Sequence, residues 1–461
     1  MKYLFALCLA IFIITIGCEP TQLQPNIIFV LADDLGYGDL GCYGQEMIQT
    51  PGLDNMAEEG MLFTRHYAGS TVCAPSRCVL MTGLHTGHCK IRGNAGVPLD
   101  EHDTTVAELL KAHGYKTALI GKWGLGLSGS GGEPNLKGFD YFFGYLSQTR
   151  AHNYYPEYLW RNGEKVLLKN EVVFASEGHA RGIGSASTNK LEYSHDLFTE
   201  EAVEYVRQKK DSAFFLYLSY TIPHANNEFE LTGAHGMEVP DYGIYESKDW
   251  PEPQKGTAAM ISRMDRDIGR LLREIRDLGI EDRTVVFFTS DNGPHREGRN
   301  DPDFFNSSGS LRGIKRDLYE GGIRVPMIVW GPGTVQAGTR SDYITAFWDF
   351  LPTACEIAGI AVPVGIDGIS IWPVITGRSQ PAHSYLYWEF YEQGGKQAIL
   401  QDPWKAIRLG VSANLDTSIL LYNLSEDPNE TVDVADMNRE VVRRLTPLFF
   451  EARTPSFDFR F

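Results

Sequence analysis

The fold is decided by a short stretch near the N-terminus that reads Asn26-Ile-Ile-Phe-Val-Leu-Ala-Asp-Asp34. Its apolar residues run without interruption and lack the alternation of a strand with one face in water. Such a run is typical of a strand buried on both faces, as in a parallel sheet covered by helices. The two carboxylates that end the run would then lie at the carboxyl edge of the sheet, where open α/β sheets bind their ligands.

Three further buried strands are predicted downstream, and helical patterns separate them. The strands are residues 116–121, 214–220 and 284–290, and the helices are residues 105–114, a segment around 196–206, and 258–278. The last helix is the clearest, because its apolar residues recur at helical spacing and Gly279 follows it. Alternating strands and helices predict an α/β fold with a large, doubly wound, mostly parallel sheet flanked by helices.

The pattern changes near residue 380. Short aromatic-rich segments at residues 385–391, 406–411 and 419–424 are typical of small antiparallel strands, and residues 434–450 predict one closing helix. We therefore expect a main α/β domain at residues 25–380 and a smaller C-terminal α+β subdomain, with a small antiparallel sheet and a helix, at residues 381–461.

The chain has 461 residues and a formal net charge of −17. This acidity argues against nucleic acid as a partner, because nucleic-acid phosphates require a basic surface. It does not exclude an anionic substrate, since a metal ion and a few converging cations set the potential of a site.

The first 18 residues predict export. A basic Lys2 precedes an apolar stretch from Tyr3 to Ile16, which is too short for a spanning helix and is typical of a cleaved signal. The sequence Thr15-Ile-Gly-Cys18 resembles a bacterial lipoprotein signal, in which Cys18 becomes the acylated first residue; the alternative is an ordinary cleaved signal. We expect a periplasmic protein or an outer-membrane or cell-surface lipoprotein, with membrane contact only through the lipid.

Two strand ends offer oxygen ligands. Asp33 and Asp34 follow the first strand, and Asp291 and Asn292 follow the strand at residues 284–290. Adjacent carboxylates repel one another unless a cation lies between them, and hard dications take several oxygen ligands. The four side chains therefore predict an all-oxygen site for calcium or magnesium. The alternative for each pair alone is a solvated turn.

The strongest signal is Cys73-Ala-Pro-Ser-Arg77. Pro75 suits the first turn of a helix, whose free N–H groups favour an anion. Arg77 adds a permanent positive charge that matches two oxygens of an ester at once. The segment predicts a cradle for an oxyanion with a thiol at its mouth; the alternative is a buried structural cysteine before an ordinary helix.

This segment, with Leu80-Met-Thr-Gly83 downstream, resembles the sulfatase signature C-x-P-S-R…T-G, in which the cysteine is oxidised after translation to formylglycine. The resemblance continues through G-K-W at 121–123, S-D-N-G at 290–293, E-G-G-I-R-V-P at 320–326, and L-Y-N-L…D-P-N-E at 421–430. The chain thus resembles the formylglycine-dependent (type I) sulfatases of the alkaline-phosphatase-like superfamily. It is similar to bacterial carbohydrate sulfatases and arylsulfatases.

The resemblance implies one calcium ion and a modified Cys73, made by a formylglycine maturation enzyme during biogenesis. One hydroxyl of the hydrated aldehyde would attack sulfur and displace the alcohol, and the second would lose its proton so that C–O cleavage expels sulfate. The implied metal ligands are Asp33, Asp34, Asp291, Asn292 and the formylglycine at position 73.

The resemblance also implies four further roles. Arg77 would orient the nucleophile, Lys122 and Lys315 would bind sulfate oxygens, and His224 would protonate the leaving oxygen. A lysine alone is more commonly a solvated surface residue, and His224 has the alternative of a hydrogen-bonded loop histidine.

The chain departs from the family at one position. The family's usual motif G-K-W-H-L-G reads G-K-W-G-L-G at residues 121–126, so Gly124 replaces a histidine that assists regeneration of the aldehyde. We expect another base to serve and consider His152 the candidate, since its segment could face the site. The glycine form also occurs in subgroups of bacterial sulfatases that keep every other site residue, so it does not indicate inactivation.

Residues 141–161 carry the clues to the substrate. Aromatic residues alternate there with Arg150, His152, Asn153 and Arg161 and could form a sugar-binding wall; the alternative is a set of core aromatics. The stretch resembles that of bacterial exo-acting carbohydrate sulfatases, which implies a terminal 4-O-sulfated galactose or N-acetylgalactosamine. Two other functions are a phosphoester or phosphonate hydrolase of the same superfamily and, because of Gly124, a non-catalytic lipoprotein that binds sulfated glycans.

Overall fold

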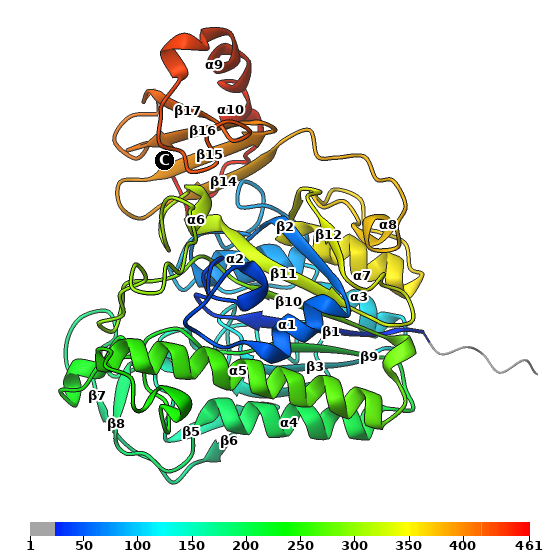
Figure 1. The fold of residues 1–461 in the computed structure, drawn as a ribbon, viewed down its shortest axis with the longest axis vertical. Coiled ribbons are helices and arrows are strands. Elements are labelled where there is room, and N and C mark those ends of the chain that lie inside the picture. The colour runs from blue at the N-terminus through cyan, green and yellow to red at the C-terminus, as the bar shows by residue number, and fades with distance from the viewer. Residues whose placement is uncertain (1–23, 416) are drawn as a thin grey trace, which may run out of the picture.

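The computed structural model describes residues 24–415 and 417–461 (Figure 1). The predicted signal and Cys18 lie outside the described residues. A large α/β part carries a smaller antiparallel sheet at one end of the molecule. This smaller sheet is formed by the C-terminal part of the chain. No helix of the described residues is long and apolar enough to cross a membrane.

An eleven-stranded sheet forms the centre, in the order β12-β2-β11-β10-β1-β9-β3-β4-β5-β6, with β13 paired to β2. Strands β10, β1, β9, β3 and β4 are parallel, whereas β11 joins β10 and β5 joins β4 antiparallel. The predicted large, mostly parallel sheet is confirmed. The bounds are β1 Asn26–Ala32, β2 Met61–Tyr67, β3 Lys116–Lys122, β4 Tyr141–Tyr145, β5 Tyr158–Arg161, β6 Glu164–Leu167, β9 Phe214–Ser219, β10 Thr284–Ser290, β11 Arg324–Trp330, β12 Thr339–Ser341 and β13 Thr345–Ala346.

Strand β1 lies at the middle of the sheet, and all of its residues are buried. Successive side chains of a strand point to opposite faces. Ile27, Phe29 and Leu31 belong to one core with the helices α2, α3 and α7, while Ile28 and Val30 belong to a second core with α1, α4 and α5. The sheet is therefore covered on both faces, which explains the uninterrupted apolar run. These helices span α1 Pro51–Glu58, α2 Cys73–Thr82, α3 Val106–Ala112, α4 Ser194–Lys209, α5 Glu252–Asp277 and α7 Phe350–Ala358.

Two differences from the predicted elements have plain causes. Helix α5 begins at Glu252 and not at residue 258, because its first turn follows Pro251 and carries a second proline before the apolar pattern starts. Strands β2 and β11 were not predicted. They pair antiparallel with one another, and β2 contains the polar residues Thr64, Arg65 and His66, which interrupt its apolar run.

The predicted C-terminal antiparallel sheet is present, and its strands are β14 Leu386–Phe390, β15 Lys396–Gln401, β16 Trp404–Leu409 and β17 Ile419–Asn423. The prediction of one closing helix at residues 434–450 is wrong. The segment forms the short helices α9 Arg439–Leu445 and α10 Leu448–Glu451, which Pro447 separates because proline lacks the N–H that a continuous helix needs. We retain residue 380 as the proposed boundary of the subdomain.

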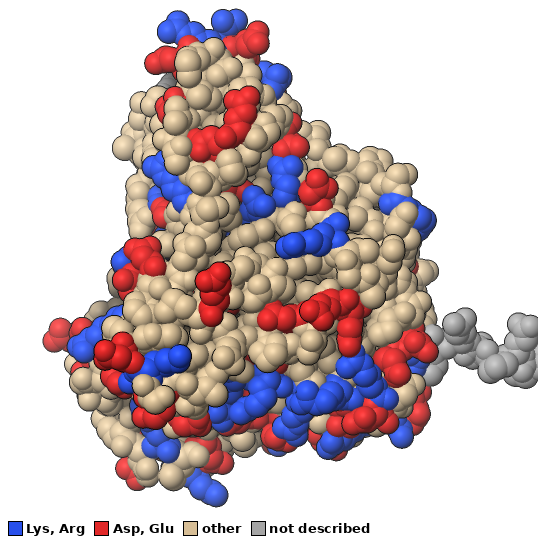
Figure 2. All heavy atoms as spheres, in the orientation of Figure 1, with Lys and Arg blue, Asp and Glu red and all other residues tan. Residues whose placement is uncertain are grey.

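The remaining elements are short: the strands β7 Glu171–Phe174 and β8 Ser185–Asn189, which pair with each other, and the helices α6 Glu320–Ile323 and α8 Trp372–Ile375. Charged side chains of both signs gather over α4 and α5 (Figure 2). Arg207 pairs there with Glu274, and Arg263 pairs with Asp196, so ion pairs tie the two helices together at the surface.

Candidate active site

The carboxylates of the site meet because β1 and β10 are parallel neighbours in register, with Ala32 opposite Ser290. Asp33 and Asp34 follow β1, and Asp291 and Asn292 follow β10, so all four lie at one edge of the sheet. Asp34 adopts a left-handed backbone conformation with φ of 67°, and its N–H donates to Asp291 Oδ1 over 3.0 Å. The structure thus brings the four predicted oxygen ligands together in a buried cluster.

The cluster has the properties of a cation site. Burial, together with the charge of Asp33, raises the pKa of Asp291 to about 7. Asn292 donates through Nδ2 to Asp34 Oδ1, yet its own Oδ1 is buried without a hydrogen-bond partner in the described part of the chain. Buried acceptors in folded proteins are nearly always partnered, so the bare Asn292 Oδ1 marks a place that a cation would fill. An all-oxygen set suits a hard dication such as calcium, so the residues present fit the metal that the sequence implies.

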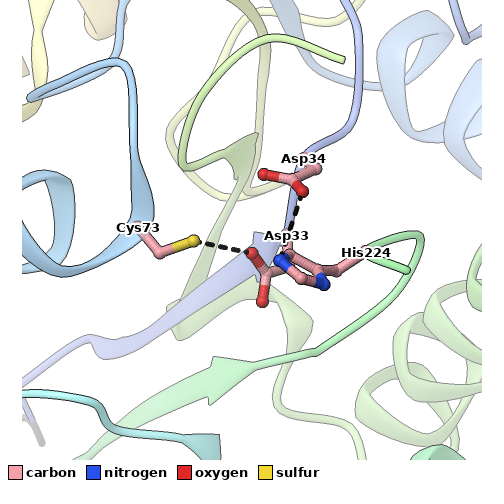
Figure 3. Close-up of side chains that lie close together, drawn as sticks. All are labelled: Asp33, Asp34, Cys73 and His224. Atoms are coloured by element: carbon pink, nitrogen blue, oxygen red, sulfur yellow. Dashed lines mark hydrogen bonds and ion pairs between the residues drawn. The ribbon is translucent and has the colours of Figure 1, made fainter. Parts of the chain in front are cut away.

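Cys73 is the first residue of α2 and points at the cluster (Figure 3). Its Sγ lies 3.4 Å from Asp33 Oδ1. Possible ligand atoms of Cys73, Asp33, Asp34 and His224 all lie within 4.8 Å of one another. Burial, and then the charge of Asp33, raises the pKa of the Cys73 thiol well above its ordinary value. The thiol therefore stays protonated, and an unmodified Cys73 is a poor nucleophile here.

Arg77 lies one turn further along α2, with no exposed surface. Its Nη2 donates to Asp291 Oδ2 over 2.8 Å, and its Nη1 donates to the carbonyl of Lys122 over 3.1 Å and to the Ser219 hydroxyl. Nε and Nη2 of Arg77 both face Asp291 Oδ2, and the predicted match of the guanidinium to two ester oxygens stays a prediction. In this arrangement Arg77 pairs with Asp291 and Asp33 and holds both carboxylates in place.

The two predicted lysines reach the site from different elements. Lys122, the last residue of β3, places Nζ 2.7 Å from Asp33 Oδ2. Lys315 places Nζ 2.8 Å from Asp34 Oδ2. Burial alone would raise the pKa of Asp33, but the charges of Lys122 and Arg77 outweigh it and hold that pKa well below its ordinary value. The surface alternative does not describe these lysines, since both are buried.

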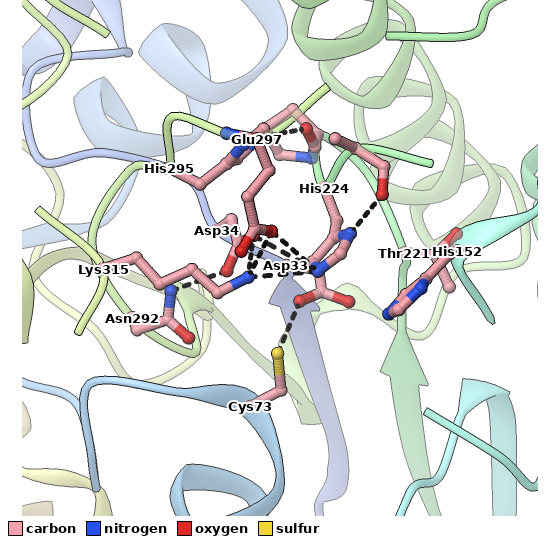
Figure 4. Close-up of polar contacts among 12 residues, drawn as sticks. Asp33, Asp34, Cys73, His152, Thr221, His224, Asn292, His295, Glu297 and Lys315 are labelled. Carbon is pink, nitrogen blue, oxygen red and sulfur yellow. Dashed lines mark hydrogen bonds and ion pairs between the residues drawn. The ribbon is translucent and has the colours of Figure 1, made fainter. Parts of the chain in front are cut away.

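His224 stands in the loop after β9, opposite Cys73 (Figure 4). Its Nδ1 lies 2.6 Å from the carbonyl oxygen of Ala225, so this nitrogen carries the proton. Its Nε2 then presents a lone pair to the Lys315 ammonium, 3.1 Å away. Burial and the charge of Lys315 lower the pKa of His224 to about 3. The imidazole is therefore neutral in this arrangement.

His152 lies beside His224. The two rings stack with centroids 4.9 Å apart, and His152 Nδ1 lies 3.1 Å from Glu228 Oε2. His152 is thus at the site, but it pairs with His224 and Glu228.

Glu297 was not predicted. Its Oε2 lies 3.0 Å from Lys315 Nζ and 3.7 Å from His224 Nε2. The available signal was its place a few residues after Asp291-Asn-Gly, on the loop that follows β10. A carboxylate at this distance from two basic groups favours the protonated, positively charged form of both.

Only part of the sugar-binding wall predicted at residues 141–161 is exposed and so open to contact with a sugar. Tyr145, Tyr154 and Tyr155 are buried in the core, which agrees with the alternative of core aromatics. Arg150 pairs with Glu157, and Arg161 pairs with Glu201. Tyr158 and Trp160 of β5 keep part of their surface exposed.

Comparison with known proteins agrees with this geometry. The profile of the Sulfatase family matches residues 25–360, and that of the N-sulphoglucosamine sulphohydrolase C-terminal region matches residues 314–452. Arylsulfatase A of Homo sapiens is 32% identical over 471 residues, with 92% of this chain and 87% of that protein covered. Arylsulfatase D of Homo sapiens is 32% identical over 447 residues, with 80% and 72% covered. The crystal structure of Ps i-CgsB in complex with k-i-k-neocarrahexaose superposes with a TM-score of 0.76 at 27% identity, covering 94% of each chain.

Proposed function

The chain belongs to the sulfatase family, and from that premise we propose that it removes sulfate from a sulfated carbohydrate, with Cys73 as the precursor of its nucleophile. Sulfatases hydrolyse sulfate esters. The observation that carries the finer proposal is the convergence of Cys73, three carboxylates, two lysines and His224 in one buried site. The solved structure of Ps i-CgsB in complex with k-i-k-neocarrahexaose supports a sugar as substrate. We propose a terminal 4-O-sulfated galactose or N-acetylgalactosamine.

We propose that Asp33, Asp34, Asp291 and Asn292, with the modified residue at position 73, hold one calcium ion. The unpartnered Asn292 Oδ1 supports a metal at this place. Bound calcium would supply positive charge to the sulfate group. The hydrated formylglycine would supply two hydroxyls, one to bond sulfur and one whose deprotonation allows sulfate to leave. Support for the modification comes from its position, because Cys73 begins α2 and its Sγ lies 3.4 Å from Asp33 Oδ1, inside the carboxylate cluster.

The chain's own residues would then bind the sulfate group and protonate the leaving oxygen. Lys122 and Lys315 lie in the same cluster as Cys73 and would bind sulfate oxygens, since each ammonium donates up to three hydrogen bonds. Arg77 would fix Asp291 and thereby the position of the metal ligands.

His224 would protonate the leaving oxygen. Its Nε2 must first gain a proton, which the negative charges of Glu297 and the substrate favour and Lys315 opposes. When the S–O bond to the sugar breaks, that proton would pass from Nε2 to the sugar oxygen, so that the sugar leaves as a neutral alcohol.

The test is sulfate release from a panel of 4- and 6-O-sulfated galactose and N-acetylgalactosamine, with one phosphate ester included. The protein is co-expressed with a formylglycine maturation enzyme and compared with Cys73→Ala and with chelated protein. Sulfate release lost in both controls supports the proposal and identifies the sugar. Phosphate release that exceeds sulfate release would favour the phosphoester alternative. Sugar binding without turnover, in protein whose formylglycine is verified by peptide mass, would favour the non-catalytic binding protein.

We also propose that the chain is exported and that Cys18 carries the lipid. The test is incorporation of labelled palmitate in a bacterial host. Incorporation that Cys18→Ala abolishes supports the anchor, whereas a secreted protein without label would favour an ordinary signal.

A further inference from the structure

The space next to Gly124 is filled by another residue. Gly124 lies two residues beyond Lys122 and has φ of 77°, a conformation that favours glycine. A Cβ at this position would lie 2.3 Å from Nε2 and 2.6 Å from Cδ of Gln148. The room that any side chain at position 124 would need is therefore occupied by the Gln148 amide. The histidine that the family usually carries there cannot be accommodated without moving Gln148.

Gln148 lies on the loop that runs beside the end of β3. Strands β3 and β4 pair in parallel, with Lys122 opposite Tyr145, and the loops after them continue side by side because the Gly124 N–H donates to the carbonyl of Leu146. Gln148 follows on the second loop. The chain then enters the short helical turn Arg150–His152, whose last residue stacks on His224. Along the chain, Gln148 thus lies between the end of β4, which pairs with Lys122, and His152, which stacks on His224.

The amide of Gln148 lacks partners. Both its Oε1 and its Nε2 are buried, and neither makes a hydrogen bond within residues 24–415 and 417–461. Buried amides in folded proteins are nearly always hydrogen-bonded, and the exceptions commonly mark a place for a ligand or a water molecule. Here a donor and an acceptor stand together beside a site whose proposed substrate offers both anionic oxygens and hydroxyls.

We propose that Gln148 contacts the substrate, with Nε2 donating to an oxygen of the sulfate group and Oε1 accepting from a neighbouring sugar hydroxyl. The absence of a side chain at Gly124 gives the Gln148 amide the room to take this position. The inference rests on the proposed function, because it specifies a contact of the same site. It also gives the departure at Gly124 a physical reason: the glycine makes room for an amide supplied by the next loop. His152, by contrast, already pairs with Glu228.

The test is binding of inorganic sulfate, measured by titration calorimetry in calcium, together with turnover on the panel described above. Gln148→Met keeps the length and volume of the side chain and removes both hydrogen-bonding atoms. We expect sulfate affinity and kcat/KM to fall about 10- to 100-fold, as for loss of a buried hydrogen bond to a charged group. Gln148→Glu should lose more, because its carboxylate repels sulfate. The neighbouring Thr149→Ala is the matched control and should behave as the wild type.

A thermal melt separates contact from packing. Gln148→Met should keep the wild-type Tm, since it replaces an unpartnered buried amide with an apolar group of similar size. If sulfate affinity and turnover of Gln148→Met stay within about twofold of the wild type, the amide holds only a structural water and the inference is overturned while the proposed function stands. If the wild type hydrolyses no ester yet Gln148→Met weakens sulfate binding, the proposed function fails and the contact stands. Wild-type protein that neither binds sulfate nor turns over would overturn both.

Discussion

Lys405→Met should destabilise the protein strongly. The Lys405 ammonium lies 2.9 Å from Glu320 Oε1 and 3.0 Å from Glu430 Oε1, and all three side chains are fully buried. Lys405 belongs to β16 of the C-terminal sheet and Glu320 begins α6, so the cluster joins the two parts of the molecule. Methionine fills much of the volume but removes the cation that pairs with Glu430 and leaves Glu320 only its pair with Arg324 over 3.4 Å. Breaking a buried pair in this way costs about 3–5 kcal/mol of the free energy of unfolding.

The cost should depend on pH. In the wild type, burial and the charge of Glu320 raise the pKa of Glu430 to about 7, whereas Lys405 outweighs burial and holds the pKa of Glu320 below its ordinary value. Without Lys405 the folded-state pKa of Glu430 rises further above the value of about 4.3 for an unfolded chain, while Glu320 keeps Arg324 as a positive partner. The folded variant then binds more protons than the unfolded chain, so its stability is greatest below that value and falls as pH rises. The slope is about 1.4 kcal/mol per pH unit for each extra proton bound.

The assay is urea unfolding at pH 6 and pH 8, followed by circular dichroism and tryptophan fluorescence. We expect a larger loss at pH 8, and partial recovery in Lys405→Met/Glu430→Gln, which removes one unpaired charge. Lys111→Met is the control, because its pair with Asp140 is largely exposed and should be worth less than about 1 kcal/mol. A loss below about 1 kcal/mol for Lys405→Met, the same at both pH values, would refute the reasoning.

Three further outcomes follow from the site. Calcium should raise the Tm of the wild type relative to chelated protein. Asp291→Asn removes one negative charge from the carboxylate cluster and should abolish that rise. A rise equal to that of the wild type would count against Asp291 as a ligand. His224→Ala should lower kcat/KM on a sugar sulfate by about 100- to 10,000-fold and on an aryl sulfate by less, because a good leaving group needs little protonation; equal losses on both would speak against a general acid. Inorganic sulfate should bind more tightly in calcium than in chelator by calorimetry, and equal affinities would show that the two sites are independent.

The sequence allowed the central strands and the carboxylate cluster to be predicted, because both follow from local rules. A buried parallel strand is an apolar run, and the residues after two such strands meet at one edge, as Asp33 and Asp291 do. Strand β2 could not be predicted in the same way, since its polar residues interrupt the pattern. Gln148 and Glu297 gain their importance only from residues distant in the sequence, and no local pattern marks such a contact. The partners of Arg77 were missed for the same reason, because residue type alone does not say which anion a guanidinium meets.

The cations of the site explain how the carboxylates can be buried before any metal arrives. Arg77 pairs with Asp291, Lys122 with Asp33, and Lys315 with Asp34, so each carboxylate has a positive partner and the chain can fold with the cluster closed. The two lysines of this set are also the proposed sulfate ligands. A dication that neutralises Asp33 and Asp34 would weaken their hold on Lys122 and Lys315, and the ammonium groups would become available to an anion. A bound sulfate group, in turn, would add negative charge to the cluster and so favour binding of the dication. Because coupling of this kind is reciprocal, the same two ion pairs that stabilise the buried carboxylates would make calcium and substrate favour each other's binding.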